Sequence, residues 1–178
     1  MSKMVCVILA SPSRIGSTST LAVEAANAIE GADVRIHFLN KLKFMDCQGC
    51  HFCKQGKPCP LKDDLTPVLE DVRNCDAIII ATPVYFGRAT GLYDMYEDRT
   101  FKLYTEQKEP PRRKALVVVS AGAPIEHARP TAERIQRILT RRNFDASIFL
   151  HSTKQHGLPK DNPEMLELAR EAGRKLFD

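Results

Sequence analysis

The sequence predicts one α/β domain, in which a five-stranded parallel sheet is covered by helices on both faces. Two observations predict this fold class. Five short apolar runs alternate with helical patterns along the 178 residues, which is typical of a three-layer sandwich. Three of the runs are almost entirely apolar, as strands covered on both faces should be. No repeat, linker or low-complexity segment divides residues 1–178, so we expect a single domain.

The individual elements follow from hydrophobic periodicity and from helix-terminal residues. We predict strands at residues 4–9, 33–39, 77–81, 115–120 and 146–150, and helices at 18–30, 65–74, 91–99, 126–142 and 163–177. Pro163 suits the first turn of the last helix, and Asn162 can cap it. The segments 40–62 and 101–114 are long for loops of a compact domain, and we expect them to be functional.

Charge and cysteine content exclude several classes of protein. Lys+Arg 26 and Asp+Glu 22 give a net charge of +4, and the basic residues are scattered apart from a knot at 112–114, which we interpret as a solvated loop. Neither nucleic acid nor a membrane is therefore expected as a partner. We expect a soluble, cytoplasmic protein, because the chain shows no leader and no apolar run near 18 residues. Six cysteines without a secretion signal argue against a disulfide framework, and Cys6 and Cys75 are expected to be buried hydrophobes.

The segment 11–18 lies between the first predicted strand and the first predicted helix. A helix N-terminus in this position binds anions through free backbone N–H groups. Hydroxyl groups add donors and a glycine allows close approach; these residues are Ser11, Ser13, Gly16, Ser17 and Thr18. The loop lacks both the lysine of a nucleotide P-loop and the Gly-x-Gly-x-x-Gly of a dinucleotide site. A phosphate monoester such as that of FMN is therefore the expected guest, and simple helix capping by serine and threonine is the alternative.

A second group of candidate residues follows the third and fourth predicted strands. The third strand ends in Thr82-Pro83, and Val84, Tyr85, Phe86 and Gly87 come next. The fourth strand is followed by small residues, among them Ser120 and Gly122, which leave room at the same edge of the sheet. A flat ring could lie there against backbone and aromatic side chains. Equally, Tyr85 and Phe86 could be ordinary packing residues.

Together these segments resemble the flavodoxin-fold NAD(P)H-dependent FMN reductase superfamily. Residues 11–18 are similar to its Ser-Pro-Arg-x-x-Gly-Asn-Thr phosphate loop, residues 83–87 match its Pro-Val-Tyr-Phe-Gly ring segment, and Asp98-Arg99 match the Asp-Arg that ends the next helix. The resemblance implies a flavodoxin-like strand order 2-1-3-4-5 and an FMN site. The implied site residues are Ser11, Ser13, Arg14, Gly16, Ser17, Thr18, Pro83, Val84, Tyr85, Phe86, Gly87, Ser120 and Gly122. Two positions depart from the family pattern: Ser13 replaces a common Arg, for which Arg14 is a candidate substitute, and Ser17 replaces a common Asn.

Four cysteines form the run Cys47-x2-Cys50-x2-Cys53-x5-Cys59-Pro60. This spacing resembles the ferredoxin pattern, and one [4Fe–4S] cluster would need all four thiolates. Zinc is less favoured, because structural zinc sites usually pair two separated Cys-x2-Cys units. The remaining alternative is a loop of free thiols. Within the superfamily such a quartet is typical of the iron–sulfur flavoproteins, which carry a [4Fe–4S] cluster beside FMN.

These patterns predict an FMN-dependent oxidoreductase with no assigned catalytic side chain, because the cofactor itself performs flavin chemistry. NAD(P)H or ferredoxin is the expected donor, and a quinone, a flavin or a protein is the expected acceptor. The resemblance and the long loops predict a homodimer or homotetramer. Three alternatives stay open: a flavodoxin-like electron carrier, an FMN or quinone reductase without a cluster, and a metal-binding or redox-sensing module without FMN.

Overall fold

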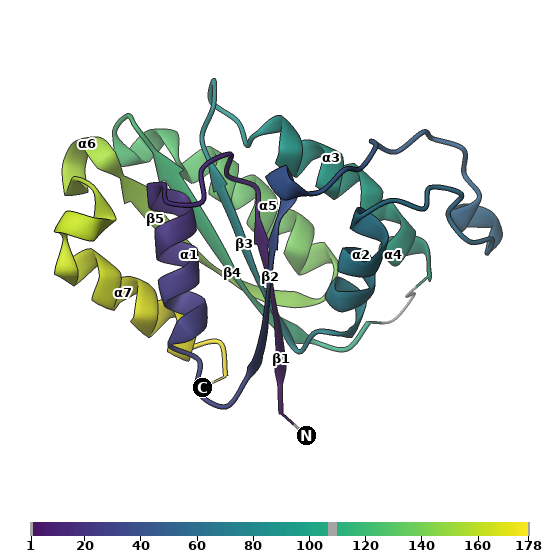
Figure 1. Ribbon diagram of the computed structural model, residues 1–178, viewed down its shortest axis with the longest axis horizontal. Helices are drawn as coiled ribbons and strands as arrows, with labels where there is room; N and C mark the ends of the chain where they lie inside the picture. Colours follow the sequence, from purple (N-terminus) through teal and green to yellow (C-terminus); the bar gives the residue numbers. More distant parts are fainter. Residues whose placement is uncertain (1, 107–109, 178) are drawn as a thin grey trace.

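The computed structural model describes residues 2–106 and 110–177, and its centre is a five-stranded parallel sheet in the order β2-β1-β3-β4-β5 (Figure 1). This confirms the predicted fold class and strand order. The strands are β1 (Met4–Leu9), β2 (Asp33–Phe38), β3 (Ala77–Pro83), β4 (Arg113–Ala121) and β5 (Phe144–Ser152). All four neighbouring pairs are parallel, so the carboxyl ends of the strands share one edge of the sheet.

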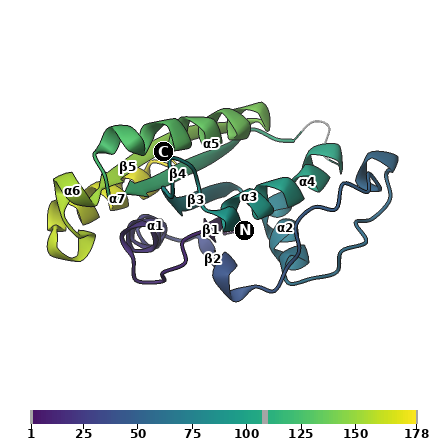
Figure 2. The same cartoon turned by 90° about the horizontal axis from the view of Figure 1, so that it is seen from above.

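Helices cover both faces of the sheet. They are α1 (Ser17–Asn27), α2 (Leu65–Asn74), α3 (Gly91–Arg99), α4 (Phe101–Glu106), α5 (Arg129–Arg141), α6 (Thr153–His156) and α7 (Pro163–Arg174), with 3₁₀ turns η1 (Leu39–Lys41), η2 (Cys53–Gln55), η3 (Ile125–His127) and η4 (Pro159–Asp161). Helices α1 and α7 pack on one face, and α2, α3 and α5 pack on the other (Figure 2). No helix of the described residues is both long enough and apolar enough to cross a bilayer.

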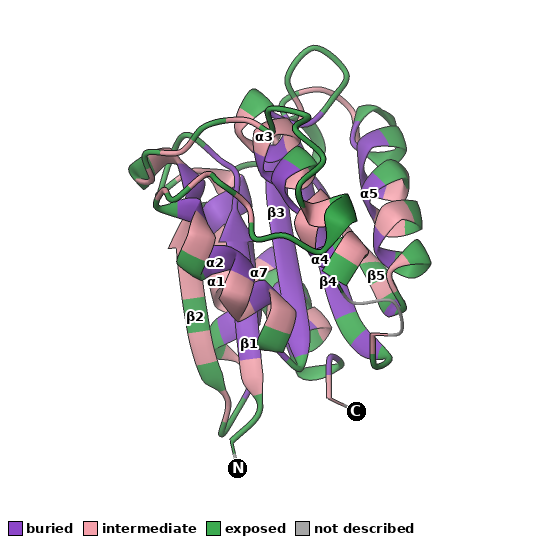
Figure 3. Ribbon diagram, turned by 90° about the vertical axis from the view of Figure 1, so that its right-hand side faces the viewer, coloured by how far each residue is buried: buried purple, intermediate pink, exposed green. Residues whose placement is uncertain are grey.

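Successive residues of β1 supply the two separate cores. Val5 and Val7 belong to the core beneath α1 and α7, whereas Cys6 and Ile8 belong to the core beneath α2, α3 and α5. This alternation follows from the two-residue period of a strand. Figure 3 shows the central strands as almost continuously buried. Cys6 and Cys75 are both buried, as the sequence predicts.

Helices α1 and α7 approach each other closely at Gly173. A Cβ atom at this position would lie 1.9 Å from the carbonyl oxygen of Ala25, which is far inside contact distance. Glycine therefore permits the packing of α7 against α1. At the start of α7, Asn162 accepts a hydrogen bond from the Met165 backbone N–H at 3.0 Å, as predicted for its cap.

The segment 101–114 is predicted as a loop; its residues 107–109 lie outside the described residues, and the rest differs from that prediction. Its first part forms α4, and β4 begins at Arg113 rather than at residue 115. The interpretation of 112–114 as a solvated knot is wrong for Arg113, which is buried. Its guanidinium lies 4.3 Å from the Phe144 ring centre and donates to the carbonyl oxygens of Val72 and Cys75 at 3.0 and 3.3 Å. These acceptors lie some forty residues away, so the local charge pattern could not indicate them.

Candidate functional site

The loop between β1 and α1 leaves the helix N-terminus open. Gly16 is the N-cap residue, and the Thr20 N–H donates to its carbonyl oxygen at 3.0 Å. The N–H groups of the three residues between them therefore have no partner within the helix. No side chain caps α1, so the alternative in which serine or threonine serves only as a cap does not describe this helix. The arrangement is one that binds an anion.

Hydrogen bonds within this loop fix its shape. The Ser11 hydroxyl accepts from the Ser13 N–H at 3.2 Å and donates to the Ser13 carbonyl oxygen at 3.0 Å. The Ser19 hydroxyl donates to the same oxygen at 2.6 Å, and the Asn40 amide donates to the Pro12 carbonyl oxygen at 2.7 Å. Ser11 thus shapes the loop rather than presenting a free hydroxyl. Ser19 and Asn40 were not predicted, because nothing local distinguishes them from surface polar residues.

Four further predicted residues lie in this loop or at the start of α1. Arg14 is exposed, and its guanidinium carbon lies 4.5 Å from the centre of the Phe38 ring. Thr18 is buried at the start of α1. Ser13 and Gly16 are in close contact, because a Cβ at Gly16 would lie 3.2 Å from the Ser13 Cβ. Small residues at these positions keep the approach to the helix N-terminus free.

The connection from β3 to α3 makes a tight turn beyond the carboxyl edge (Figure 1). Tyr85 and Arg88 exchange backbone hydrogen bonds at 2.8 and 3.2 Å, and Phe86 and Gly87 both have positive φ, at 52° and 75°. Phe86 is fully exposed and Tyr85 is about half exposed. The alternative that these two aromatic residues pack in the core is therefore wrong within this chain. The turn presents aromatic surface at the edge where a ring is expected.

Thr90 holds the start of the loop before α1 and the end of β3 together at one edge of the sheet. Its hydroxyl donates to the Ala10 carbonyl oxygen at 2.7 Å, directly before the loop that precedes α1. Its N–H donates to the Thr82 hydroxyl at 3.2 Å, at the end of β3. The Val84 N–H donates to the Ser120 carbonyl oxygen at 2.8 Å, which adds the end of β4. Segments 11–18, 83–87 and 120–122 therefore meet at the carboxyl edge.

The end of β4 is supported by β5. Ser120 is buried, and its hydroxyl oxygen lies 2.7 Å from His151 Nδ1, while His151 Nε2 lies 3.1 Å from the Gly157 carbonyl oxygen. Burial lowers the pKa of His151 below its ordinary value of 6.5, with a smaller contribution from His156. Gly122 is exposed at the same edge. His151 is a residue that sequence reasoning missed.

All four cysteines of the predicted quartet line one hollow of about 580 Å³, between residues 46–62 and the helices α3 and α4. Cys47 and Cys50 are exposed, Cys53 and Cys59 are half-buried, and all four thiols are free. Across residues 2–106 and 110–177, however, no three His, Cys, Asp or Glu side chains converge closely enough to hold a metal ion. The four thiols thus surround one hollow, but they do not converge into a metal site among the described residues.

The loop that carries the cysteines is closed at its base by Arg99. The Arg99 guanidinium donates to the Met45 carbonyl oxygen at 2.7 Å and to both carboxylate oxygens of Asp63 at 2.6 and 3.1 Å. Burial alone would raise the pKa of Asp63, but the bonds from Arg99, Met45 and Leu65 outweigh it and hold this pKa below 3.8. Asp98, the neighbour of Arg99, lines the hollow, and burial and then Asp46 raise its pKa.

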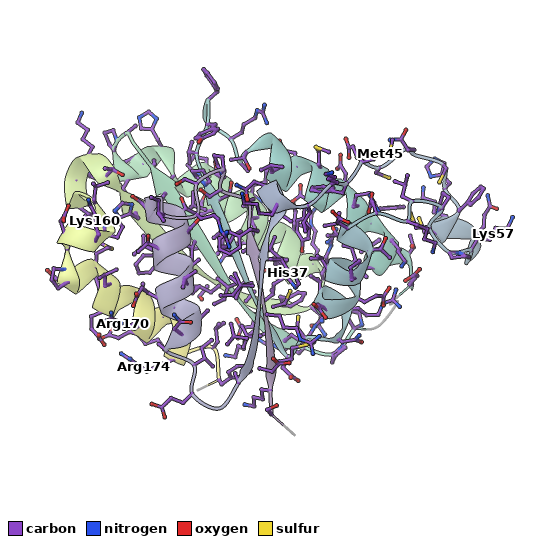
Figure 4. All side chains as sticks on the ribbon, in the orientation of Figure 1. His37, Met45, Lys57, Lys160, Arg170 and Arg174 are labelled. Atoms are coloured by element: carbon purple, nitrogen blue, oxygen red, sulfur yellow. The ribbon has the colours of Figure 1, made fainter. Side chains whose placement is uncertain are left out.

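This loop extends sideways past α3 and α4, away from the connection between β1 and α1 (Figures 1 and 4). Figure 4 shows Met45 near its base and Lys57 near its tip. The sequence predicts that the cysteines emerge on the flavin's side of the sheet, within one chain or across subunits, and this stays a prediction.

Comparison with known proteins identifies a family and several relatives of this chain. The sequence model of a family described as NADPH-dependent FMN reductase matches residues 4–151. An iron-sulfur flavoprotein of Methanocaldococcus jannaschii is 37% identical over 95 residues, which are 52% of this chain and 49% of that relative. The match thus spans about half the length of that protein. An iron-sulfur flavoprotein of Archaeoglobus fulgidus is 29% identical over 139 residues, 77% of this chain and 70% of the relative.

Solved structures share the fold over the whole length. An NAD(P)H:quinone oxidoreductase from Methanothermobacter marburgensis superposes with a TM-score of 0.70 at 18% identity. The superposition covers 100% of this chain and 98% of that one.

Proposed function

This chain belongs to the NADPH-dependent FMN reductase family, and on that premise we propose that it is an FMN-dependent oxidoreductase. The observation that carries the proposal is the uncapped N-terminus of α1, which opens at the same edge as the turn 83–87 and the end of β4. An anion site beside exposed aromatic and glycine backbone suits a phosphorylated ring compound. When bound, FMN accepts hydride and exchanges single electrons.

Each residue of the edge has a distinct part in holding the cofactor. The free N–H groups at the start of α1 bind the phosphate, with the hydroxyls of Ser13, Ser17 and Thr18. Gly16 allows the close approach, and Arg14 supplies positive charge in place of the family's usual arginine. Residues 83–87 and Gly122 line the ring, while Ser11 and Ser120 maintain the shape of their segments through the hydrogen bonds described above.

We further propose that the cysteine quartet would ligate one [4Fe–4S] cluster, which would supply single-electron transfer alongside the chemistry of the flavin. The support is the ferredoxin-like spacing, the shared hollow, and the iron-sulfur names of the relatives. The thiols must move inward to ligate it, and the Arg99 contacts leave residues 46–62 free to do so between fixed ends. The free thiols also suit a reducing compartment such as the cytoplasm.

The proposed redox partners follow the same scheme. NAD(P)H or a reduced protein such as ferredoxin supplies the electrons, and a quinone, a flavin or a protein accepts them. A homodimer or homotetramer covers the exposed Ile15 and Phe86 and completes the shallow edge on which the ring lies. A monomeric mass by light scattering across micromolar concentrations would contradict this assembly.

Anaerobic purification followed by flavin, iron and acid-labile sulfide analysis tests the whole proposal. We expect FMN bands together with a broad iron–sulfur shoulder, both bleached by the electron donor. Flavin without iron would support the second candidate, an FMN or quinone reductase without a cluster. Absence of both would refute the proposed function.

A further inference from the structure

His151 joins two segments that reach the carboxyl edge. It stands opposite Ser120 in the register of β4 and β5, so the two side chains meet directly. The Gly157 carbonyl oxygen can only accept a hydrogen bond. Nε2 of His151 therefore carries a proton and donates to this oxygen at 3.1 Å. Nδ1 of the neutral ring is then an acceptor, and the Ser120 hydroxyl donates to it at 2.7 Å. The geometry thus fixes both the tautomer of His151 and the direction of the Ser120 hydroxyl.

Two further contacts hold the segment after β4 to the segment after β5. The Ser152 hydroxyl donates to the Ala123 carbonyl oxygen at 2.7 Å. The Ile125 N–H donates to the Gln155 side-chain oxygen at 2.9 Å. Residues 120–125 are therefore held at three points from residues 151–155. His151 and Ser152 are both fully buried.

Ser120 also connects His151 to the turn after β3. The backbone carbonyl of Ser120 accepts from the Val84 N–H at 2.8 Å, and Ser120 lies opposite Pro83 in the register of β3 and β4. A change in the conformation of Ser120 would thus move residues on both sides of the expected ring. His151 itself lies behind this layer, because its ring is enclosed by β4, α6 and the Gly157 backbone.

We propose that His151 is a positioning residue for the flavin edge: through Ser120 it holds segments 83–87 and 120–125 in the conformation that receives the ring. This inference rests on the proposed function. The neutral imidazole performs the task, because protonation would turn Nδ1 into a donor and force the Ser120 hydroxyl to point elsewhere. The ionisable group beside it is His156, whose ring centre lies 5.5 Å away and whose Nδ1 accepts from the Ser152 N–H.

The test is FMN binding by the apoprotein, followed through quenching of FMN fluorescence. His151→Phe keeps the ring volume and removes both hydrogen bonds, and we expect about tenfold weaker binding. His151→Asn keeps an acceptor near the place of Nδ1, and its affinity should return to within about threefold of the wild type. His37→Phe is the matched control, because His37 is a partly buried histidine on the distant edge strand β2 and should leave binding unchanged.

Ser120→Ala decides whether His151 acts through Ser120. We expect the same loss as in His151→Phe, and no additional loss in the double variant. Additive losses, or wild-type affinity of His151→Phe, would overturn the inference while leaving the proposed function intact. A wild-type chain that binds no FMN would overturn both. If His151→Phe does not fold, Ser120→Ala and His151→Asn still decide the question, with circular dichroism to verify their folding.

A purely structural role would not produce a pH dependence that vanishes in one variant. As the pH falls below 6.5, wild-type affinity should fall relative to that of His151→Asn, because burial lowers the pKa of His151 from 6.5 and asparagine does not titrate. The FMN phosphate titrates in the same range in both proteins, so the comparison is made at each pH. A constant ratio of the two affinities would contradict the role given to the neutral ring.

Discussion

Replacing Arg99 by methionine should destabilise the protein and loosen the base of the cysteine loop, residues 46–62. The substitution removes three hydrogen bonds of 2.6 to 3.1 Å, to Met45 and Asp63, from a side chain that is 2% exposed. It leaves the Asp63 carboxylate with only backbone N–H donors, those of Met45 and Leu65. Breaking a buried ion pair typically costs 3–5 kcal/mol; because Asp63 is still 15% exposed, we expect about 3 kcal/mol.

The measurement is the free energy of unfolding in urea, together with hydrogen exchange at the backbone amides of residues 43–65. Arg88→Met is the matched control, because the Arg88–Asp94 pair is 2.7 Å long but 65% and 41% exposed, and its loss should cost no more than about 1 kcal/mol. Asp63 also gives a pH signature. Its pKa is lower in the folded state, so its contribution is complete above pH 3.8 and is lost as the pH falls through the folded value. Equal losses in Arg99→Met and Arg88→Met, with unchanged exchange at residues 43–65, would refute the reasoning.

Three further substitutions test other parts of the account. Thr18→Glu places a carboxylate at the buried start of α1, and repulsion should abolish FMN retention; unchanged flavin content in the purified variant would contradict the phosphate site. Gly173→Ala should lower the free energy of unfolding by about 2 kcal/mol or more, since its Cβ would meet the Ala25 carbonyl, whereas Gly91→Ala meets nothing within 4 Å and should stay near the wild-type value in the same urea titration. Cys53→Ala should lower iron and sulfide content after anaerobic purification and Cys6→Ala should not; equal iron content in the two variants would argue against the ligand assignment.

The sequence was sufficient for the fold and for the edge at which the candidate site lies. Short apolar runs predicted every strand to within a few residues, because burial on both faces leaves little freedom in composition. The strand order came from the resemblance carried by residues 11–18 and 83–87, and the sheet confirms it. The short helix α4 was missed, since its six residues carry too little periodicity to distinguish it from a loop.

Contacts between distant segments could not be predicted. His151 meets Ser120 through strand register across 31 residues, and Arg99 reaches Met45 across 54. Neither pairing leaves a local pattern, because each depends on how elements are placed in space. The cysteine spacing indicated a common set of ligands. The thiols of the described residues do not converge, because metal binding and the folding of a metal site are coupled.

Binding of FMN compared with riboflavin tests the central claim most directly. The two ligands share the ring and differ only in the phosphate that the N-terminus of α1 is proposed to hold. With several charge-assisted hydrogen bonds to this group, the apoprotein should bind FMN at least about a hundredfold more tightly than riboflavin. Equal affinity for the two ligands in the same fluorescence titration would contradict the phosphate site, and with it the placement of the cofactor at the carboxyl edge of the sheet.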